Sequence, residues 1–334
     1  MLRSVVALCA LLLFGAAPAQ ALVQRAYVSA LTGNDANTAT NCPATAPCRW
    51  FAGAISVVTP GGEIVAMDSG AYGTVTITKS ISIVSAPGAY AGITVFSGNG
   101  VTIASAGLTV VLRGLTINSL GGDYGIAVTA GAALSVENCV VSNFSLTSGA
   151  GLYVNAPAEV AVVKTLFRGN YDGVRFSGGA KAQISDSQFL RNTVSGVLVD
   201  SSAGATEVSA ERVVSSGNGS SGFVASATAG SASLAIKSAL ASENGSHGIG
   251  GSASASGAVA VNVSKSLSTA NGLTGVFASG DGARVVVSSS TITRNAAYGL
   301  YQASSAVFMS TGDNRVSDNA VGPSSGTISS LTPM

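Results

Sequence analysis

The feature that most constrains the fold of this 334-residue chain is an internal repeat. Its core is an asparagine, followed three or four residues later by a glycine and an apolar residue. The glycines of successive units are 22 to 27 residues apart, and a period in this range indicates stacked repeats. The six clearest copies begin at Asn170, Asn192, Asn218, Asn244, Asn271 and Asn295.

The apolar residues inside each unit alternate with period two, as in residues 174–176, 182–184 and 259–263. This alternation indicates strands that bury one face. No unit contains a helical stripe of ten or more residues, which argues against helical and horseshoe solenoids, and a propeller blade needs about 40 residues. Two or three short strands per unit therefore predict a parallel β-helix, in which each strand pairs with its copy about 4.8 Å above.

The recurring asparagines are expected to form one corner of successive coils. Asparagine tolerates the left-handed backbone conformation that a tight corner needs, and stacked asparagine side chains can hydrogen-bond along the stack. The glycine that follows is expected to meet a similar backbone need. The sequence thus predicts a structural ladder of Asn170, Asn192, Asn218, Asn244, Asn271 and Asn295.

The chain divides into four segments by sequence character. Residues 1–21 combine a basic residue, a short apolar stretch and a small-x-small site before Leu22, which predicts a cleaved signal peptide and a secreted protein, either extracellular or periplasmic and cell-surface. Residues 22–60 include the segment Trp50 to Val58, which favours a short amphipathic helix that caps the solenoid. Residues 61–316 hold the repeats, in about ten coils. The polar residues 317–334 are predicted to be a loose tail.

Composition argues against several classes of partner. The chain has 16 basic and 15 acidic residues, so no net field attracts nucleic acid or an acidic membrane. Aromatic residues make up only 6% of the chain, and no stretch reaches the roughly 20 apolar residues of a membrane span. We expect no nucleic-acid partner and no membrane span. No phosphate-binding or dinucleotide motif is present, so no cofactor is predicted; the oligomeric state stays open.

The cysteines divide into a pair and a single residue. Cys42 and Cys48 enclose a five-residue loop, and this spacing predicts a disulfide in an oxidising compartment. Metal binding is the rival interpretation, but two thiols without a neighbouring histidine or second pair make a poor zinc site. Cys139 lies in an apolar segment and is predicted to be a buried free thiol.

Three N-terminal segments carry a resemblance to a known group of proteins: Ala26 to Asp35, Cys42 to Ile55 and Gly73 to Ile81. With the repeats, they resemble bacterial right-handed β-helix repeat proteins of the pectate-lyase-like superfamily over roughly residues 25–320. The resemblance implies an all-β, single-stranded right-handed parallel β-helix. That superfamily includes polysaccharide lyases, hydrolases, esterases, epimerases and adhesins, so the fold does not choose among these functions.

The catalytic signatures of such enzymes are missing. Hydrolysis would need two carboxylates roughly 5 to 10 Å apart, and a lyase would need a carboxylate cluster for calcium with an arginine or lysine base. The sequence has no Asp-Asp pair, no Asp-Pro-His-Asp motif, and its one histidine, His247, lies outside a Gly-His-Gly element. We expect no lyase or hydrolase activity on pectin, polygalacturonate or alginate, and no metal site.

Aligning the repeats gives two rows of weak catalytic candidates. The position before the repeat glycine holds Asp172 and, three coils on, His247; about 14 Å would separate them, too far for a base and its orienting acid. This row comprises Tyr124, Ala150, Asp172, Ser195, Ser221, His247, Thr274 and Tyr298. A second row, about six residues before the asparagine, includes Glu137, Lys164 and Asp186. It is interpreted either as a carboxylate-plus-base site or as a surface charge ladder.

The sequence therefore predicts a secreted β-helix protein that is a noncatalytic glycan-binding or structural and adhesive surface protein. The predicted partner is an extracellular polysaccharide or a cell-surface glycan. Two alternatives stay open. One is a polysaccharide-active enzyme, such as a lyase, hydrolase or epimerase, with an unrecognised site on the parallel β-face. The other is a module of a larger assembly.

Overall fold

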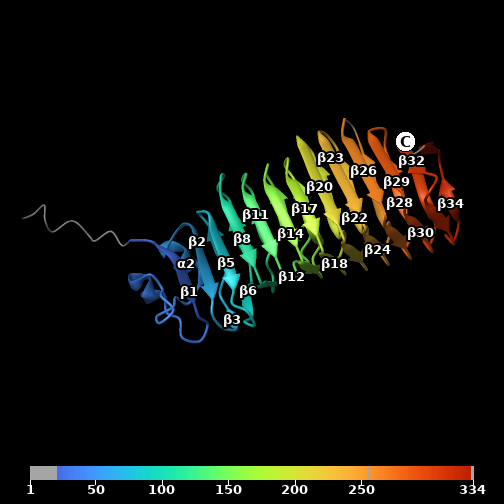
Figure 1. The fold of residues 1–334 in the computed structure, drawn as a ribbon. Coiled ribbons are helices and arrows are strands. Elements are labelled where there is room, and N and C mark those ends of the chain that lie inside the picture. Colours follow the sequence, from blue (N-terminus) through green and yellow to red (C-terminus); the bar gives the residue numbers. More distant parts are fainter. Residues whose placement is uncertain (1–20, 255, 332–334) are drawn as a thin grey trace, which may run out of the picture.

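The computed structural model describes residues 21–254 and 256–331, and it shows a long all-β solenoid (Figure 1). The predicted signal peptide, apart from Ala21, lies outside the described residues. Successive coils each contribute one strand to three parallel sheets, here called A, B and C, with 13, 11 and 11 strands. Each strand pairs in parallel with its counterpart in the next coil, as the period-two pattern predicts.

Sheet A contains β1 (Val23–Val28), β2 (Val58–Ala66), β5 (Ile81–Ser85), β8 (Thr109–Arg113), β11 (Ala133–Glu137), β14 (Glu159–Val163), β17 (Lys181–Ser185), β20 (Ala205–Glu211), β23 (Ser231–Lys237), β26 (Ala258–Ser264), β29 (Ala283–Ser288), β32 (Val307–Thr311) and β35 (Ile328–Leu331). Sheet B contains β3 (Gly70–Ala71), β6 (Ala91–Val95), β9 (Leu115–Ser119), β12 (Val140–Ser142), β15 (Leu166–Arg168), β18 (Gln188–Leu190), β21 (Val214–Ser216), β24 (Leu240–Ser242), β27 (Leu267–Thr269), β30 (Thr291–Thr293) and β33 (Arg315–Ser317). Sheet C contains β4 (Val75–Ile77), β7 (Asn99–Ile103), β10 (Tyr124–Val128), β13 (Ala150–Asn155), β16 (Asp172–Ser177), β19 (Val197–Ser201), β22 (Phe223–Ala227), β25 (Ile249–Ala253), β28 (Val276–Ser279), β31 (Tyr298–Ala303) and β34 (Gly322–Ser325).

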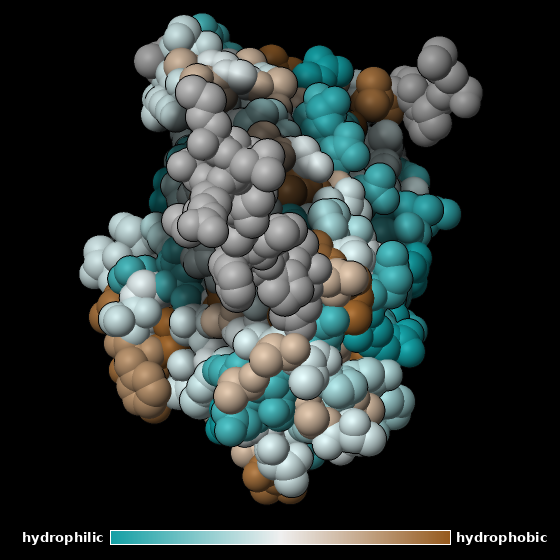
Figure 2. Space-filling view, turned by 90° about the vertical axis from the view of Figure 1, so that its left-hand side faces the viewer, coloured by the Kyte–Doolittle hydropathy of each residue, from teal (hydrophilic) through white to brown (hydrophobic). Residues whose placement is uncertain are grey.

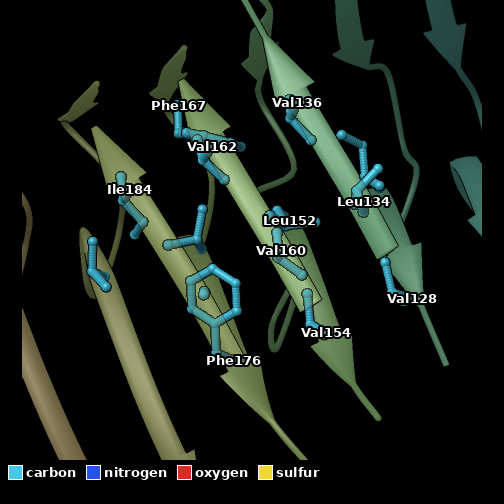
Figure 3. Close-up of a cluster of buried hydrophobic side chains, with 14 of the residues drawn as sticks. Val128, Leu134, Val136, Leu152, Val154, Val160, Val162, Phe167, Phe176 and Ile184 are labelled. Atoms are coloured by element: carbon cyan, nitrogen blue, oxygen red, sulfur yellow. The ribbon is translucent and has the colours of Figure 1, made fainter. Parts of the chain in front are cut away.

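The interior of the solenoid is filled by the apolar residues of all three sheets (Figure 3). Leu134 and Val160 from sheet A, and Leu152 and Phe176 from sheet C, all point into the same buried cluster. Because each coil repeats the pattern of the one before it, like side chains stack. The rings of Phe167 and its counterpart one coil on, at position 189, lie 5.4 Å apart and nearly parallel. This continuous core is the main stabilising element of the stack.

The N-terminal region covers the first coil, and Figure 2 looks onto this end of the solenoid. It contains a 3-10 helix, η1 (Asp35–Thr40), and the helix α2 (Phe51–Val57), which falls where the amphipathic pattern predicts a helix. Phe51 of α2 is buried and its ring stacks on Tyr72 at 5.1 Å. The predicted disulfide is present: Cys42 and Cys48 are bonded, with their Cα atoms 5.1 Å apart. Cys139 is a buried free thiol, as predicted.

The C-terminal segment differs from the prediction. Residues 317–334 were expected to form a loose tail, but β34 and β35 lie within them and pair with β31 and β32. Asn319 also hydrogen-bonds to Asn295 of the coil before it. The strands of this segment are short and largely exposed, and exposed positions carry polar residues. A polar composition therefore did not distinguish this coil from a tail. None of the described helices is long and apolar enough to cross a membrane.

The asparagines form a buried ladder between sheets B and C. The side-chain amide of Asn244 donates to Oδ1 of Asn271 at 2.9 Å, and its own Oδ1 accepts from both the amide and the backbone N–H of Asn218 at 2.9 and 3.1 Å. The second amide hydrogen of Asn244 goes to the carbonyl of Ser215 at 3.2 Å. The same pattern links the six predicted asparagines and continues to Asn319.

The prediction that the repeat asparagine has a left-handed backbone is wrong. The left-handed residue of this corner is the one before the asparagine: φ is 52° at Arg191, 56° at Glu243 and 55° at Ala270. Within the described residues, none of the ladder asparagines has a positive φ. The repeat glycine is needed for space instead. A Cβ at Gly222 would lie 2.6 Å from the carbonyl oxygen of Gly248 in the next coil, closer than real contacts allow.

Candidate functional site

The outer side of sheet C carries three in-register columns of residues, of which two matter most here; the third includes Asp200 and Ser226. Column one is the position before the repeat glycine, and strand register and backbone hydrogen bonds join its members from coil to coil, which confirms the predicted row. It comprises Tyr124, Ala150, Asp172, Ser195, Ser221, His247, Thr274 and Tyr298. Column two comprises Ala127, Tyr153, Arg175, Leu198, Val224, Gly250, Phe277 and Tyr301.

Asp172 is an acid held almost out of solvent on this face. Its residue is 2% exposed, and one carboxyl oxygen accepts the backbone N–H of Ser195 at 3.1 Å. Burial raises the pKa of Asp172 to about 6, because a charged carboxylate loses its hydration there; the Ser195 N–H and the charge of Arg175 oppose the shift without cancelling it. A carboxyl group with this pKa exchanges protons near neutral pH, which is the range that general acid–base chemistry uses.

Arg175 brings a cation next to this acid. Its guanidinium is held by Asp200 of the neighbouring strand, with Nη2 donating at 2.8 Å, and both side chains are about one-quarter to one-third exposed. The pKa of Arg175 stays above its ordinary value despite burial, because of the hydrogen bond and charge of Asp200. The Nε atom is buried and has no hydrogen-bond partner within the described chain.

A tyrosine pair adjoins the charged residues. Tyr124 and Tyr153 stack with ring centroids 4.5 Å apart and planes 14° apart. Tyr153 directly precedes Arg175 in column two, and Ala150 separates Tyr124 from Asp172 in column one. Burial raises the pKa of Tyr124, so its hydroxyl stays a neutral donor and acceptor at physiological pH. We call Tyr124, Tyr153, Asp172, Arg175 and Asp200 the first patch.

A second aromatic group lies on the same columns toward the C-terminal end. The ring of His247 packs on Phe277 at 4.3 Å, and its Nδ1 is 2.6 Å from the hydroxyl of Thr274. Burial lowers the pKa of His247, so the ring is neutral near pH 7. Tyr298 and Tyr301 follow in the next coil, with centroids 6.2 Å apart and planes 18° apart. We call these two tyrosines the second patch.

The other weak catalytic candidates lie elsewhere. Lys164 and Asp186 occupy the left-handed position of the corner between sheets A and B, with φ of 49° and 51°, whereas Asp172 is on sheet C. Asp186 is exposed and pairs with Arg212 at 2.8 Å. The structure therefore does not bring Asp172, Lys164 and Asp186 into one site.

The second row was also misaligned by one residue at Glu137. This residue belongs to the last strand position of sheet A, where it pairs with Val163 in register, and its carboxylate binds Arg113 at 2.7 Å. The left-handed residue of that coil is the neighbouring Asn138. The carboxylate-plus-base interpretation fails on this geometry, and paired surface charges remain.

Sequence reasoning missed Tyr153, Arg175 and Asp200. Tyr153 and Arg175 both lie two residues after the repeat glycine, so the same alignment that identified column one contained column two. The prediction rested only on the position before the glycine. The signal that could have identified them is column two itself, in which tyrosine and arginine occur two residues after the repeat glycine.

The outer face of sheet A carries an open groove of about 720 Å³. Its floor is formed by uncharged side chains that pair in register from strand to strand, with a row of charged side chains beside them. The lining includes Val111, Ser135, Ala161, Gln183, Ser209, Ala235, Glu159, Lys181 and Glu207. No aromatic side chain lines it, and its charges are exposed. Within the described residues, no group of three or more histidine, cysteine or acidic side chains could hold a metal ion.

The sequence and the fold are similar to those of known right-handed β-helix proteins. The family model described as "Right handed beta helix region" matches residues 91–262. No curated protein sequence matches the chain. Among solved structures, pectate lyase Pel9A has a TM-score of 0.56 at 17% identity, over 90% of this chain and 80% of that one.

Two further structures show the same fold. The periplasmic alginate epimerase AlgG has a TM-score of 0.54 at 10% identity, covering 83% of this chain and 79% of that one. The catalytic unit of a GH87 α-1,3-glucanase from Streptomyces thermodiastaticus has a TM-score of 0.52 at 13% identity, covering 94% and 68%. At these identities the similarity concerns the fold alone.

Proposed function

This chain belongs to the right-handed β-helix family, and from that premise we propose that it is a secreted protein whose sheet C binds an extended polysaccharide. The observation that carries the proposal is the first patch: a stacked tyrosine pair beside a buried acid and an ion-paired arginine, all on the outer side of sheet C. An aromatic ring offers an apolar face to the C–H side of a sugar ring, while its hydroxyl and the nearby charges hydrogen-bond to sugar hydroxyls.

The similar structures support a carbohydrate ligand. The solved proteins named above are a pectate lyase, an alginate epimerase and a glucanase. The Cys42–Cys48 disulfide supports an oxidising location outside the cytoplasm. The partner is then an extracellular polysaccharide or a cell-surface glycan.

Binding without catalysis is the function we favour, because the first patch has a single acid of raised pKa and its second carboxylate, on Asp200, is neutralised by Arg175. Asp172 nevertheless favours one second candidate, a polysaccharide-active enzyme in which this carboxyl transfers a proton. Asp172→Asn separates the two. A binding protein keeps its glycan affinity within a few-fold and shows no turnover to lose. An enzyme releases product from its glycan, and the variant binds without releasing it.

The experiment is a titration of the purified chain with polygalacturonate, alginate, α-1,3-glucan and β-1,4-linked glucan and mannan, followed by calorimetry. For a glycan that binds, we expect Tyr153→Ala to weaken the affinity about tenfold, equivalent to about 1.4 kcal/mol. The matched control is Tyr90→Ala, which removes an exposed tyrosine just before β6 of sheet B, away from sheet C.

Two results would overturn the proposal. One is the absence of binding to any glycan in the panel. The other is binding that Tyr153→Ala and Tyr90→Ala change equally, because the ligand would then not contact the first patch.

A further inference from the structure

The two tyrosine patches occupy the same two columns toward opposite ends of sheet C: Tyr124 and Tyr153 come from the adjacent strands β10 and β13, and Tyr298 and Tyr301 both come from β31. Tyr124 and Tyr298 both belong to column one, and Tyr153 and Tyr301 both belong to column two. Six strand-to-strand steps separate Tyr153 from Tyr301 along column two, which is about 29 Å at about 4.8 Å per step. Both pairs are partly exposed.

The positions between the patches hold small or aliphatic side chains. Column two passes through Leu198, Val224 and Gly250, and column one through Ser195 and Ser221. The two serines are almost fully buried. A straight ligand that contacts both patches therefore meets no large side chain until it reaches the aromatic group at the C-terminal end.

The packing of that aromatic group keeps it close to the sheet. A Cβ at Gly250 would lie 2.0 Å from the ring of Phe277, so the ring occupies space that any other residue would fill. Phe277 is only 8% exposed and supports His247. Beyond the second patch, the strand β34 offers only Gly322 and Ser325 beside the two tyrosines. The ring of Tyr298 lies 3.8 Å from the point where a Cβ on Gly322 would be, so no neighbouring side chain from that coil covers it.

We propose that the second patch is a further binding site for the same glycan chain, so that the face selects long, straight polysaccharides over short ones. The inference rests on the proposed function of the first patch. The ligand class follows from spacing. An extended chain of pyranoses with equatorial 1,4 links advances per sugar by slightly more than the strand spacing, which is about 4.8 Å. Each coil of sheet C then faces about one sugar, and a chain of about seven sugars reaches from the first patch to the second. A coiled α-1,4-linked chain cannot keep this register.

The experiment measures affinity against chain length. Linear β-1,4-linked oligosaccharides of three to ten sugars, from whichever β-1,4-linked polymer of the panel binds best, are titrated into the chain by calorimetry. Joining two sites by one ligand raises affinity by effective concentration. We expect chains of about seven or more sugars to bind at least tenfold more tightly than the trimer, with one ligand per protein.

Two variants locate the gain. Tyr301→Ala should remove the advantage of long chains and leave the affinity for the trimer unchanged, whereas Tyr153→Ala should weaken both. Val224→Trp places a large ring on the outer face midway between the patches. It should also remove the long-chain gain while the trimer still binds. Thermal unfolding of each variant checks that the fold is retained.

The outcomes separate this inference from the proposed function. Trimer binding that Tyr153→Ala abolishes, with no rise in affinity at greater length, overturns the two-patch inference alone. A long-chain gain that survives both Tyr301→Ala and Val224→Trp overturns it as well. Absence of binding at every length overturns both the inference and the proposed function.

Discussion

The corner between sheets B and C and the outer face of sheet C are built by the same repeats, and they use repetition in opposite ways. At the corner, every coil from Asn170 to Asn319 presents the same residue, and each amide bonds to the next. On the face, only a few residues away in each coil, column one changes from tyrosine to alanine, aspartate, serine, histidine and threonine.

The contrast shows which positions serve the stack and which serve a ligand. A side chain that must bond to its own copy one coil above has to be the same in every coil. A side chain on the outer side of the sheet has no such requirement, whether or not it reaches solvent, and is free to differ. Unlike residues clustered on an otherwise repetitive surface, as in the first patch, are therefore where a ligand-specific role is expected.

The largest effect should come from breaking the ladder. Asn244→Ala leaves the buried backbone N–H of Asn218 without an acceptor and removes one of the three acceptors of the Asn218 amide. It also takes an amide donor away from Oδ1 of Asn271 and from the carbonyl of Ser215. At about 1–3 kcal/mol for each buried group, the loss should total about 4 kcal/mol. The free energy of unfolding, measured by urea denaturation, checks this.

Glycine at the same position sharpens the comparison. If the asparagine were the left-handed residue, Asn244→Gly would be milder than Asn244→Ala. Because the left-handed residue is Glu243, with φ of 56°, we expect Asn244→Gly to be at least as damaging. Glu243→Gly is the matched control and should be neutral or slightly stabilising. A milder Asn244→Gly would show that the corner geometry is assigned incorrectly.

The repeat glycine should give the next largest effect. In Gly222→Ala the added methyl group would lie 2.6 Å from the carbonyl oxygen of Gly248 and 2.9 Å from the amide nitrogen of Asn244. Overpacking of this kind costs about 1–3 kcal/mol, and here the ladder bond is displaced as well. Gly312→Ala, where no atom lies within 4 Å of the new methyl group, should change the unfolding free energy little. Equal losses in the two variants would argue against the steric explanation.

The asparagine ladder and the repeat glycine show how much of the fold could be predicted from the sequence. The spacing of asparagine and glycine and the period-two strands predicted the coils, the buried ladder and the outer row, because each is repeated many times. The reason for the glycine was not readable. It depends on how closely the carbonyl of the coil above approaches, and a one-dimensional pattern carries no such distance.

The candidate site was predicted only in part. Asp172 was identified as a weak candidate from its row, but its burial, its raised pKa and its contact with Ser195 depend on three-dimensional packing. Arg175 and Tyr153 were overlooked because neither matches a known catalytic motif. The prediction of a loose C-terminal tail was also wrong, because the polar residues around Asn319 form another coil.

A smaller change in the free energy of unfolding, a stabilisation and not a loss, is expected from replacing Asp172 on sheet C. Burial raises the pKa of Asp172 to about 6, from 3.8 when unperturbed, so the folded state holds this proton more tightly than the unfolded state does. The stability that the protonated carboxyl contributes is fully present below about pH 4. It is lost as the pH rises through about 6.

Asp172→Asn should therefore stabilise the fold at pH 8 by about 2 kcal/mol and leave it unchanged at pH 4. Urea denaturation at the two pH values measures the difference. An acid that destabilises the fold at neutral pH is expected where a residue is kept for binding and not for stability. A pH-independent effect, or a loss of stability at pH 8, would contradict the assignment of Asp172 as a buried, titrating acid.

The smallest effect is expected at the corner between sheets A and B, where the sequence suggested a second set of catalytic candidates. Lys164 and Asp186 are held by left-handed backbone, and Asp186 forms an exposed ion pair with Arg212 at 2.8 Å. Exposed pairs are screened by water and salt and contribute little to stability. Asparagine keeps the shape of aspartate and tolerates the left-handed conformation. We expect Asp186→Asn and Lys164→Gln to shift neither the urea midpoint nor the glycan affinity measurably, in contrast to Asp172→Asn and Tyr153→Ala. If either variant lowers glycan binding or abolishes a turnover that the native chain shows, then the ligand reaches this corner. The functional distinction between the face of sheet C and the rest of the solenoid would then be wrong.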